Sequence, residues 1–173
     1  MTFTLVFMER KITHTFVFNR ELLWIGAVLF GAALITLGSI VRVPLYPVSF
    51  TLQTLAVFFV GLTQTPKQAA ASGVCYLLCA TAGLPVLGGH ANPLWLVKKC
   101  GGFLLAFPIG AYLIARLRKR PLLALLCGSA VIFTLGWIWL AYFFGAKVAL
   151  MQGVLIFLPS EALKIILAWR VFK

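Results

Sequence analysis

Six long apolar runs, separated by short turns that carry most of the charge, constrain the fold of this chain more than any other feature. Hydrophobic residues make up 62% of the 173 positions and charged residues 10%, which is more apolar surface than a soluble domain of this size needs. A helix needs about 20 mostly apolar residues to cross a bilayer. The sequence therefore predicts an all-α integral membrane protein with an N-terminal lead, residues 1–21, and one membrane domain, residues 22–173. Its six transmembrane helices are expected at residues 22–41, 48–63, 67–83, 101–117, 122–144 and 149–172.

The positive charge of the chain is distributed as in a membrane protein rather than as in a nucleic-acid-binding protein. The formal net charge is +12, but the basic residues cluster at the ends of the apolar runs and the aromatic residues lie within them. With six spans, ten of the fifteen Lys and Arg residues fall on the side of the termini and four on the other. Because basic residues favour the cytoplasmic face, both termini are predicted to be cytoplasmic. We expect no cleavable signal peptide, because the first run is long enough to stay in place as a span.

The acidic residues point to a candidate site in the last apolar run. The chain has only three, Glu9, Glu21 and Glu161, and only Glu161 lies within the predicted membrane domain. Lys164 follows three residues later, so both side chains lie on one face of a helix. An ionisable group in a bilayer costs roughly 3 kcal/mol or more and usually faces a cavity or a partner. We interpret the pair as the polar floor of a pocket open to the outside; the alternatives are an ion pair near the membrane surface or one facing another subunit.

A proline-containing break precedes further candidate binding residues. Pro44 and Pro47 cannot continue the first helix, and the polar residues Thr51, Gln53 and Thr54 follow shortly after them. Non-helical backbone at membrane depth is tolerated where it lines a cavity, so these side chains are predicted to hydrogen-bond a ligand.

The long irregular segment at residues 84–100 is a second candidate region. Long loops between tightly connected elements are often functional, so Asn92 is expected to bind the ligand and Trp95 to cover its apolar part. Gly101 and Gly102 open the next helix, where they allow close backbone approach and leave free amides for a ligand.

Small residues and cysteines have simpler explanations. Ala27 and Gly31 form a small-residue face for docking another helix, either of a partner subunit or of this chain. The cysteines lie in or beside apolar segments without the loop-borne pairs and histidines of a metal site, so neither a disulfide nor a metal is predicted: Cys75, Cys79, Cys100 and Cys127.

Four segments resemble, in order, motifs of the BioY family of biotin transporters. Residues 43–58 contain a Phe-Thr-Leu-Gln-Thr-Leu run that resembles the family's signature after the first helix. Residues 76–86 are similar to the family as well. Residues 101–107 (Gly-Gly-Phe-Leu-Leu-Ala-Phe) resemble its Gly-Gly-Tyr-Leu-Leu-Gly-Phe run, and residues 159–164 are similar to its Pro-Gly-Asp-x-x-Lys motif.

The resemblance implies the substrate-binding S component of an energy-coupling factor (ECF) transporter in a bacterial cell membrane. Its implied partners are a transmembrane coupling subunit and two ATPase subunits, with biotin as the transported ligand and no cofactor. Glu161 and Lys164 stand where the family's acid and lysine contact the ligand, and Ala27 and Gly31 where such components dock on the coupling subunit. In a departure from the pattern, Ser160 and Glu161 replace Gly and Asp, and residues 98–100 (Lys-Lys-Cys) replace Gly-Pro-Thr.

Other functions are also compatible with the sequence. No phosphate-binding loop of the Gly-x-x-x-x-Gly-Lys-Ser/Thr type is present, so the chain is not expected to hydrolyse ATP. A solitary facilitator of biotin or a related vitamin would need no ATPase. An intramembrane enzyme using Glu161 would need a second catalytic group, for which only the loop residue His90 is available, so we predict no enzyme activity. A purely structural membrane subunit would bind no ligand.

Overall fold

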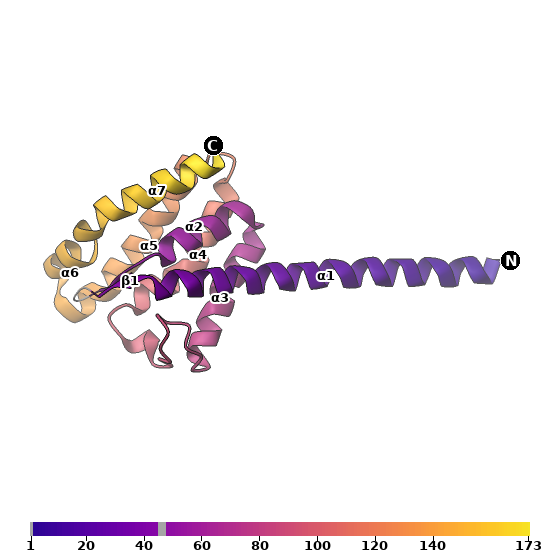
Figure 1. Ribbon diagram of the computed structural model, residues 1–173, viewed down its shortest axis with the longest axis horizontal. Helices are drawn as coiled ribbons and strands as arrows, with labels where there is room; N and C mark the ends of the chain where they lie inside the picture. Colours follow the sequence, from indigo (N-terminus) through magenta and orange to yellow (C-terminus); the bar gives the residue numbers. More distant parts are fainter. Residues whose placement is uncertain (1, 45–47) are drawn as a thin grey trace.

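The computed structural model describes residues 2–44 and 48–173, with side chains from residue 20 onward, and it forms a helical bundle (Figure 1). The helices are α1 (Thr2–Ile40), α2 (Gln53–Thr63), α3 (Pro66–Thr81), α4 (Gly101–Leu117), α5 (Pro121–Phe144), α6 (Ala146–Gly153) and α7 (Leu158–Phe172). The described chain also has two 3-10 helices, η1 (Trp95–Val97) and η2 (Leu155–Phe157), and two short antiparallel strands, β1 (Arg42–Val43) and β2 (Phe50–Thr51). In these residues, three stretches are long and apolar enough to cross a membrane: Arg20–Ile40, Pro121–Phe144 and Ala146–Phe172.

The first helix is longer than the predicted span. α1 runs without interruption from Thr2 to Ile40, so the lead expected at residues 1–21 and the first span belong to one helix. No Gly or Pro occurs before Gly26, so nothing in this stretch breaks the helix. The N-terminal half of α1 extends well beyond the bundle, whereas its C-terminal half packs against α2 and α3 (Figure 1).

The second predicted span is also not one helix. It is divided between β2 and α2, and α2 has 11 residues, a length of about 16 Å against the roughly 30 Å of a bilayer core. The strand pairs Arg42 with Thr51 and Val43 with Phe50, which brings the chain back beside the end of α1. Pro47, part of the predicted break, lies outside the described residues.

The prediction of one continuous helix at residues 149–172 is wrong. The chain forms α6, then the 3-10 turn η2, then α7, and Val154 at the junction has φ −124° and ψ −64°. Pro159 explains the interruption: it lacks an amide hydrogen, and in a continuous helix its ring would clash with the carbonyl of Leu155. At the start of α7 neither defect matters, because the first amides of a helix have no intrahelical acceptor.

Two glycines allow α4 and α5 to pack closely. α4 and α5 meet where Gly110 and Gly128 face each other, and a Cβ on either would press into Ile132 or Ile114.

On the outside of the bundle, many large apolar side chains are exposed, among them Leu23 at 76% and Leu78 at 63%. An apolar exterior around a tightly packed interior is the arrangement expected of a helical protein in lipid.

The small-residue face at Ala27 and Gly31 is occupied by this chain itself. The Gln64 side-chain amide donates a hydrogen bond to the Ala27 carbonyl at 2.6 Å, and the Ser72 hydroxyl donates to Gln64 at 2.8 Å. A Cβ on Gly31 would lie 2.7 Å from both the Gln64 amide nitrogen and Ser72 Cβ. Gly31 is thus packed within the chain, which is one of the two roles considered for this face. Ala27 is half-buried, and docking of a partner subunit on this face stays a prediction.

Two glycines of α1 test this packing. Gly31→Ala is expected to lower the free energy of unfolding by about 1–3 kcal/mol, because the new methyl group overpacks a buried contact. Gly26→Ala is the matched control: no atom lies within 4 Å of its Cβ, so the helix gains up to about 1 kcal/mol in propensity. Thermal unfolding of the purified proteins in detergent measures the difference. Equal melting temperatures for the two variants would contradict this packing.

Candidate functional site

A cavity of about 430 Å³ lies between α2, α4, α5, α7 and the loop at residues 84–100. Its walls are largely apolar and include six phenylalanines and Trp95, while its polar groups come mainly from β2, the start of α2, the loop and α7. The volume is within the range of about 300–1,000 Å³ typical of small-molecule sites, which combine apolar walls with a few placed polar groups. The arrangement is therefore that of a binding pocket for a small, mostly apolar molecule.

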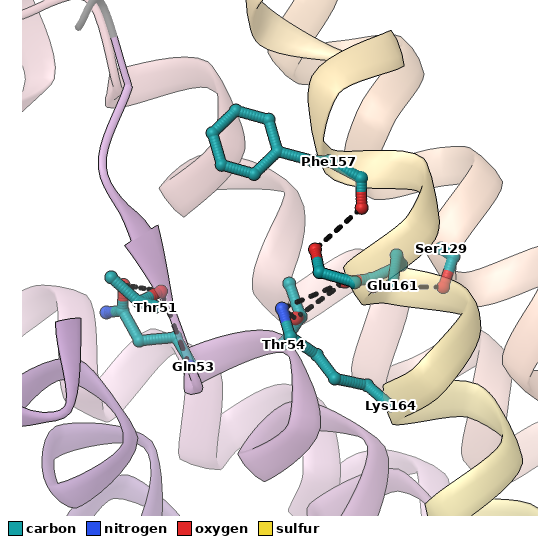
Figure 2. Close-up of polar contacts among 8 residues, drawn as sticks. Thr51, Gln53, Thr54, Ser129, Phe157, Glu161 and Lys164 are labelled. Atoms are coloured by element: carbon teal, nitrogen blue, oxygen red, sulfur yellow. Dashed lines mark hydrogen bonds and ion pairs between the residues drawn. The ribbon is translucent and has the colours of Figure 1, made fainter. Parts of the chain in front are cut away.

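A buried ion pair forms the polar floor of this cavity (Figure 2). Lys164 Nζ lies 3.0 Å from Glu161 Oε2, and the two residues are only 5% and 3% exposed. They are one turn apart at the start of α7, so the helix break at Pro159 places the carboxylate beside the positive end of the helix. Both charges are thus removed from solvent but paired, as buried charges must be.

Thr54, in the first turn of α2, joins this pair to a second helix. Its hydroxyl accepts a hydrogen bond from Lys164 Nζ at 2.8 Å and donates one to Glu161 Oε2 at 3.0 Å. Ser129 on α5 donates to the other carboxylate oxygen, Oε1, at 3.3 Å. Lys164 Nζ also lies 4.6 Å from the centre of the Phe50 ring, a cation–π distance. Groups from β2, α2, α5 and α7 therefore fix the pair in one orientation.

Gln53 and Thr51 line the cavity but are mainly bonded to protein groups. The Gln53 side-chain carbonyl accepts a hydrogen bond from the Thr51 hydroxyl at 3.1 Å, and its amide donates to the Tyr76 hydroxyl. Gln53 is 7% exposed. Tyr76 was not predicted as a site residue, although a tyrosine in an apolar helix needs a hydrogen-bond partner for its hydroxyl and so indicates a polar neighbour.

The irregular segment contributes Asn92 and Trp95 to the cavity wall, and their contact with a ligand stays a prediction. Trp95 is 5% exposed, and its indole nitrogen donates a hydrogen bond to the Thr81 hydroxyl at 3.1 Å. The Trp95 backbone amide also donates to the Asn92 carbonyl at 3.1 Å. The loop is thereby tied to the end of α3, with its aromatic ring held against the cavity.

Gly101 and Gly102 have a different place from the one expected. α4 begins at Gly101, as predicted, but neither glycine is among the residues that line the cavity. A Cβ on Gly101 would overlap the Leu96 carbonyl oxygen, and one on Gly102 would overlap the Trp139 side chain. The prediction that these glycines contact the ligand is therefore corrected: they allow α4 to pack closely against η1 and α5, outside the cavity lining.

Comparisons with known proteins agree with this architecture. The model of the BioY family matches residues 10–173. A probable biotin transporter BioY of Pyrococcus horikoshii is 34% identical over 135 residues, covering 76% of this chain and 83% of that protein. A probable biotin transporter BioY of Rickettsia prowazekii is 25% identical over 169 residues, covering 93% and 84%.

A solved structure shares the fold. The crystal structure of the S-component for biotin from an ECF-type ABC transporter superposes with a TM-score of 0.78 at 24% sequence identity, covering 89% of this chain and 90% of that one. At this level of sequence identity, the structural similarity shows that the two chains share a fold. Together with the family match over nearly the whole chain, it leads to one assignment: the chain is a membrane protein of the BioY family.

Proposed function

We propose that this chain binds biotin in the cavity above Glu161 and Lys164 and serves as the substrate-binding S component of an ECF-type transporter. The observation that carries the proposal is the buried Glu161–Lys164 pair in an aromatic cavity, on a chain of the BioY family. Relatives named as biotin transporters and the fold shared with a biotin S-component support it.

The chemistry of biotin fits the two parts of the cavity. Its fused rings are apolar apart from a cyclic urea, which offers N–H donors and a carbonyl acceptor. Among the described residues, Glu161 Oε1 receives one hydrogen bond, from Ser129, and so retains capacity to accept from a urea N–H. Lys164 Nζ uses two donors on Glu161 and Thr54, which leaves one for the urea carbonyl. The phenylalanines and Trp95 would cover the ring faces.

The longer carboxylate matters little to this scheme. Glu161 stands where the family motif has Asp, yet it is held by Thr54, Ser129 and Lys164. Because three groups from three helices orient the Glu161 carboxylate, these protein contacts accommodate its extra methylene, and the ligand does not need to shift. Thr51 and Gln53 support this scheme indirectly, since their mutual hydrogen bond orients the entry into α2 that carries Thr54.

Replacing the buried lysine tests the binding site. Lys164→Ala is expected to abolish tight biotin binding, because the urea carbonyl loses its donor and Glu161 loses its cation. Saturating biotin at about 100 times its dissociation constant should stabilise the natural protein by about 2.7 kcal/mol, and this thermal shift should vanish in the variant. Calorimetric titration measures the affinity directly.

Lys147→Ala is the matched control, because Lys147 is exposed on α6 and does not line the cavity. Thr54→Val is a milder second variant: it keeps the ion pair but removes the hydroxyl that bridges it, so biotin should bind more weakly rather than not at all. An affinity of Lys164→Ala equal to that of the natural chain would refute the site.

The energy for uptake is expected to come from other subunits. The chain has no phosphate-binding loop, so we propose that a transmembrane coupling subunit and two ATPases drive transport. Affinity purification from native membranes in mild detergent should recover these subunits with the chain. Biotin accumulation by the chain alone, in cells that lack any such ATPases, would instead establish the solitary facilitator as the correct alternative.

We further propose that both termini are cytoplasmic, as the distribution of basic residues indicates. In a variant without the native cysteines, Lys147→Cys is expected to react with a membrane-impermeant maleimide in intact cells. Lys119→Cys, in the basic turn between α4 and α5, should react only after the cells are permeabilised. The opposite labelling pattern would reverse the orientation.

A further inference from the structure

The charges of the cavity lining are unevenly distributed. Among the described residues, the lining contains four cations, Arg42, Lys98, Lys99 and Lys164, but only one carboxylate, Glu161. Glu161 is bonded to Lys164, and both are buried at the floor. The other three cations are exposed or half-buried, so they surround the solvent side of the cavity, which we call the mouth. Among the described residues of the lining, the three cations of the mouth therefore give this side of the cavity a net positive charge.

The Lys98 backbone and the Lys99 side chain both contact α5. The Lys98 carbonyl accepts a hydrogen bond from the Trp139 indole nitrogen at 3.0 Å and another from the Gly101 amide at 2.9 Å. Lys99 Nζ lies 6.0 Å from the centre of the Phe144 ring on α5. Both lysines lie just before Cys100, the N-cap of α4, and the positive N-terminal end of this helix adds to the same potential.

Arg42 reaches the mouth from another part of the chain. Its backbone is paired with Thr51 in the short β1–β2 ladder. Its guanidinium rests against Gly88, where a Cβ would lie 2.8 Å from Nη1, and Gly88 has a φ of +64° that a side chain rarely adopts. Two separate segments thus direct three cations at one opening.

We propose that Arg42, Lys98 and Lys99 form a specificity site for the anionic end of the ligand, so that the chain selects a carboxylate over an uncharged derivative. The inference rests on the proposed function and deepens it. The lysine pair is a feature of this chain, since it stands where the family pattern has Gly-Pro-Thr.

The floor is a poor place for the same carboxylate. Lys164 is already neutralised by Glu161 at 3.0 Å, so a second carboxylate beside it would meet the negative charge of Glu161. An uncharged urea meets no such repulsion. With the urea at the floor, the four-carbon chain of biotin extends its carboxylate towards the mouth, where charge-assisted hydrogen bonds are available.

A comparison of biotin with biotinamide, in which a neutral amide replaces the carboxylate, tests this orientation. Calorimetric titration of the natural chain should give at least about tenfold tighter binding of the acid, a ratio that corresponds to one charge-assisted contact. The ratio should fall as salt is raised to 0.5 M, because exposed charges are screened within about 3–8 Å at such ionic strengths.

The mouth variants then locate the source of the preference. In the double variant Lys98→Gln/Lys99→Gln, and in Arg42→Gln, the affinity ratio of acid to amide should fall towards one. Lys147→Gln removes a cation from α6 that lies outside the lining, and it should keep the ratio of the natural chain.

The outcomes separate this inference from the proposed function. Equal binding of acid and amide by the natural chain would overturn the inference alone, and so would mouth variants that retain the full preference for the acid. Failure of the natural chain to bind either compound would refute the proposed function, and the inference with it.

Discussion

The ion pair between Glu161 and Lys164 is the constraint on which the rest of the site depends. Two opposite charges in an apolar interior are each costly to bury, by several kcal/mol even after relaxation, unless they are paired and hydrogen-bonded. Here the Thr54 hydroxyl is shared between them, and Ser129 bonds the second carboxylate oxygen. Because these contacts come from three helices, the pair also specifies how α2, α5 and α7 meet.

The break between α6 and α7 gives the pair its position. Pro159 lies in the first turn of the new helix that follows η2, so Glu161 also falls in this turn, where a carboxylate is favoured by the helix dipole. In an unbroken helix the same residue would lie mid-span among apolar neighbours. The irregular backbone of η2 borders the cavity, since its last residue, Phe157, is part of the lining, and non-helical backbone in a membrane protein is tolerated where it lines a cavity.

Most of the predicted site residues could be placed at the cavity from the chemistry of their side chains, but their hydrogen-bond partners could not be predicted. Glu161, Lys164, Gln53, Thr51, Asn92 and Trp95 were singled out from the sequence and all line the cavity. A buried polar residue in an apolar chain needs a hydrogen-bond partner, so its residue type alone indicates that other polar groups lie near it. The sequence does not say which partner it has: Gln53 is bonded to Tyr76, a residue 23 positions away that no local pattern connects to it.

The roles of the glycines could not be predicted in this way, because a glycine has no side chain whose chemistry indicates its neighbours. Gly101 and Gly102 were predicted to bind the ligand, and Gly31 to contact a helix either of a partner subunit or of this chain; in the structure each allows close packing within the chain. A sequence shows that close approach is possible at a glycine, but only the neighbouring element shows what approaches.

The sequence by itself determined the membrane class, the helical architecture and the lone acid with its lysine, because hydropathy and charge are properties of residues and of their spacing. The tertiary structure alone decided that the last run breaks at Val154, that Thr54 and Ser129 complete the ion pair, and that Arg42 lies at the same opening as Lys98. These outcomes depend on contacts between segments far apart in the chain. Such contacts are set by how whole helices pack, which no local pattern of residues encodes.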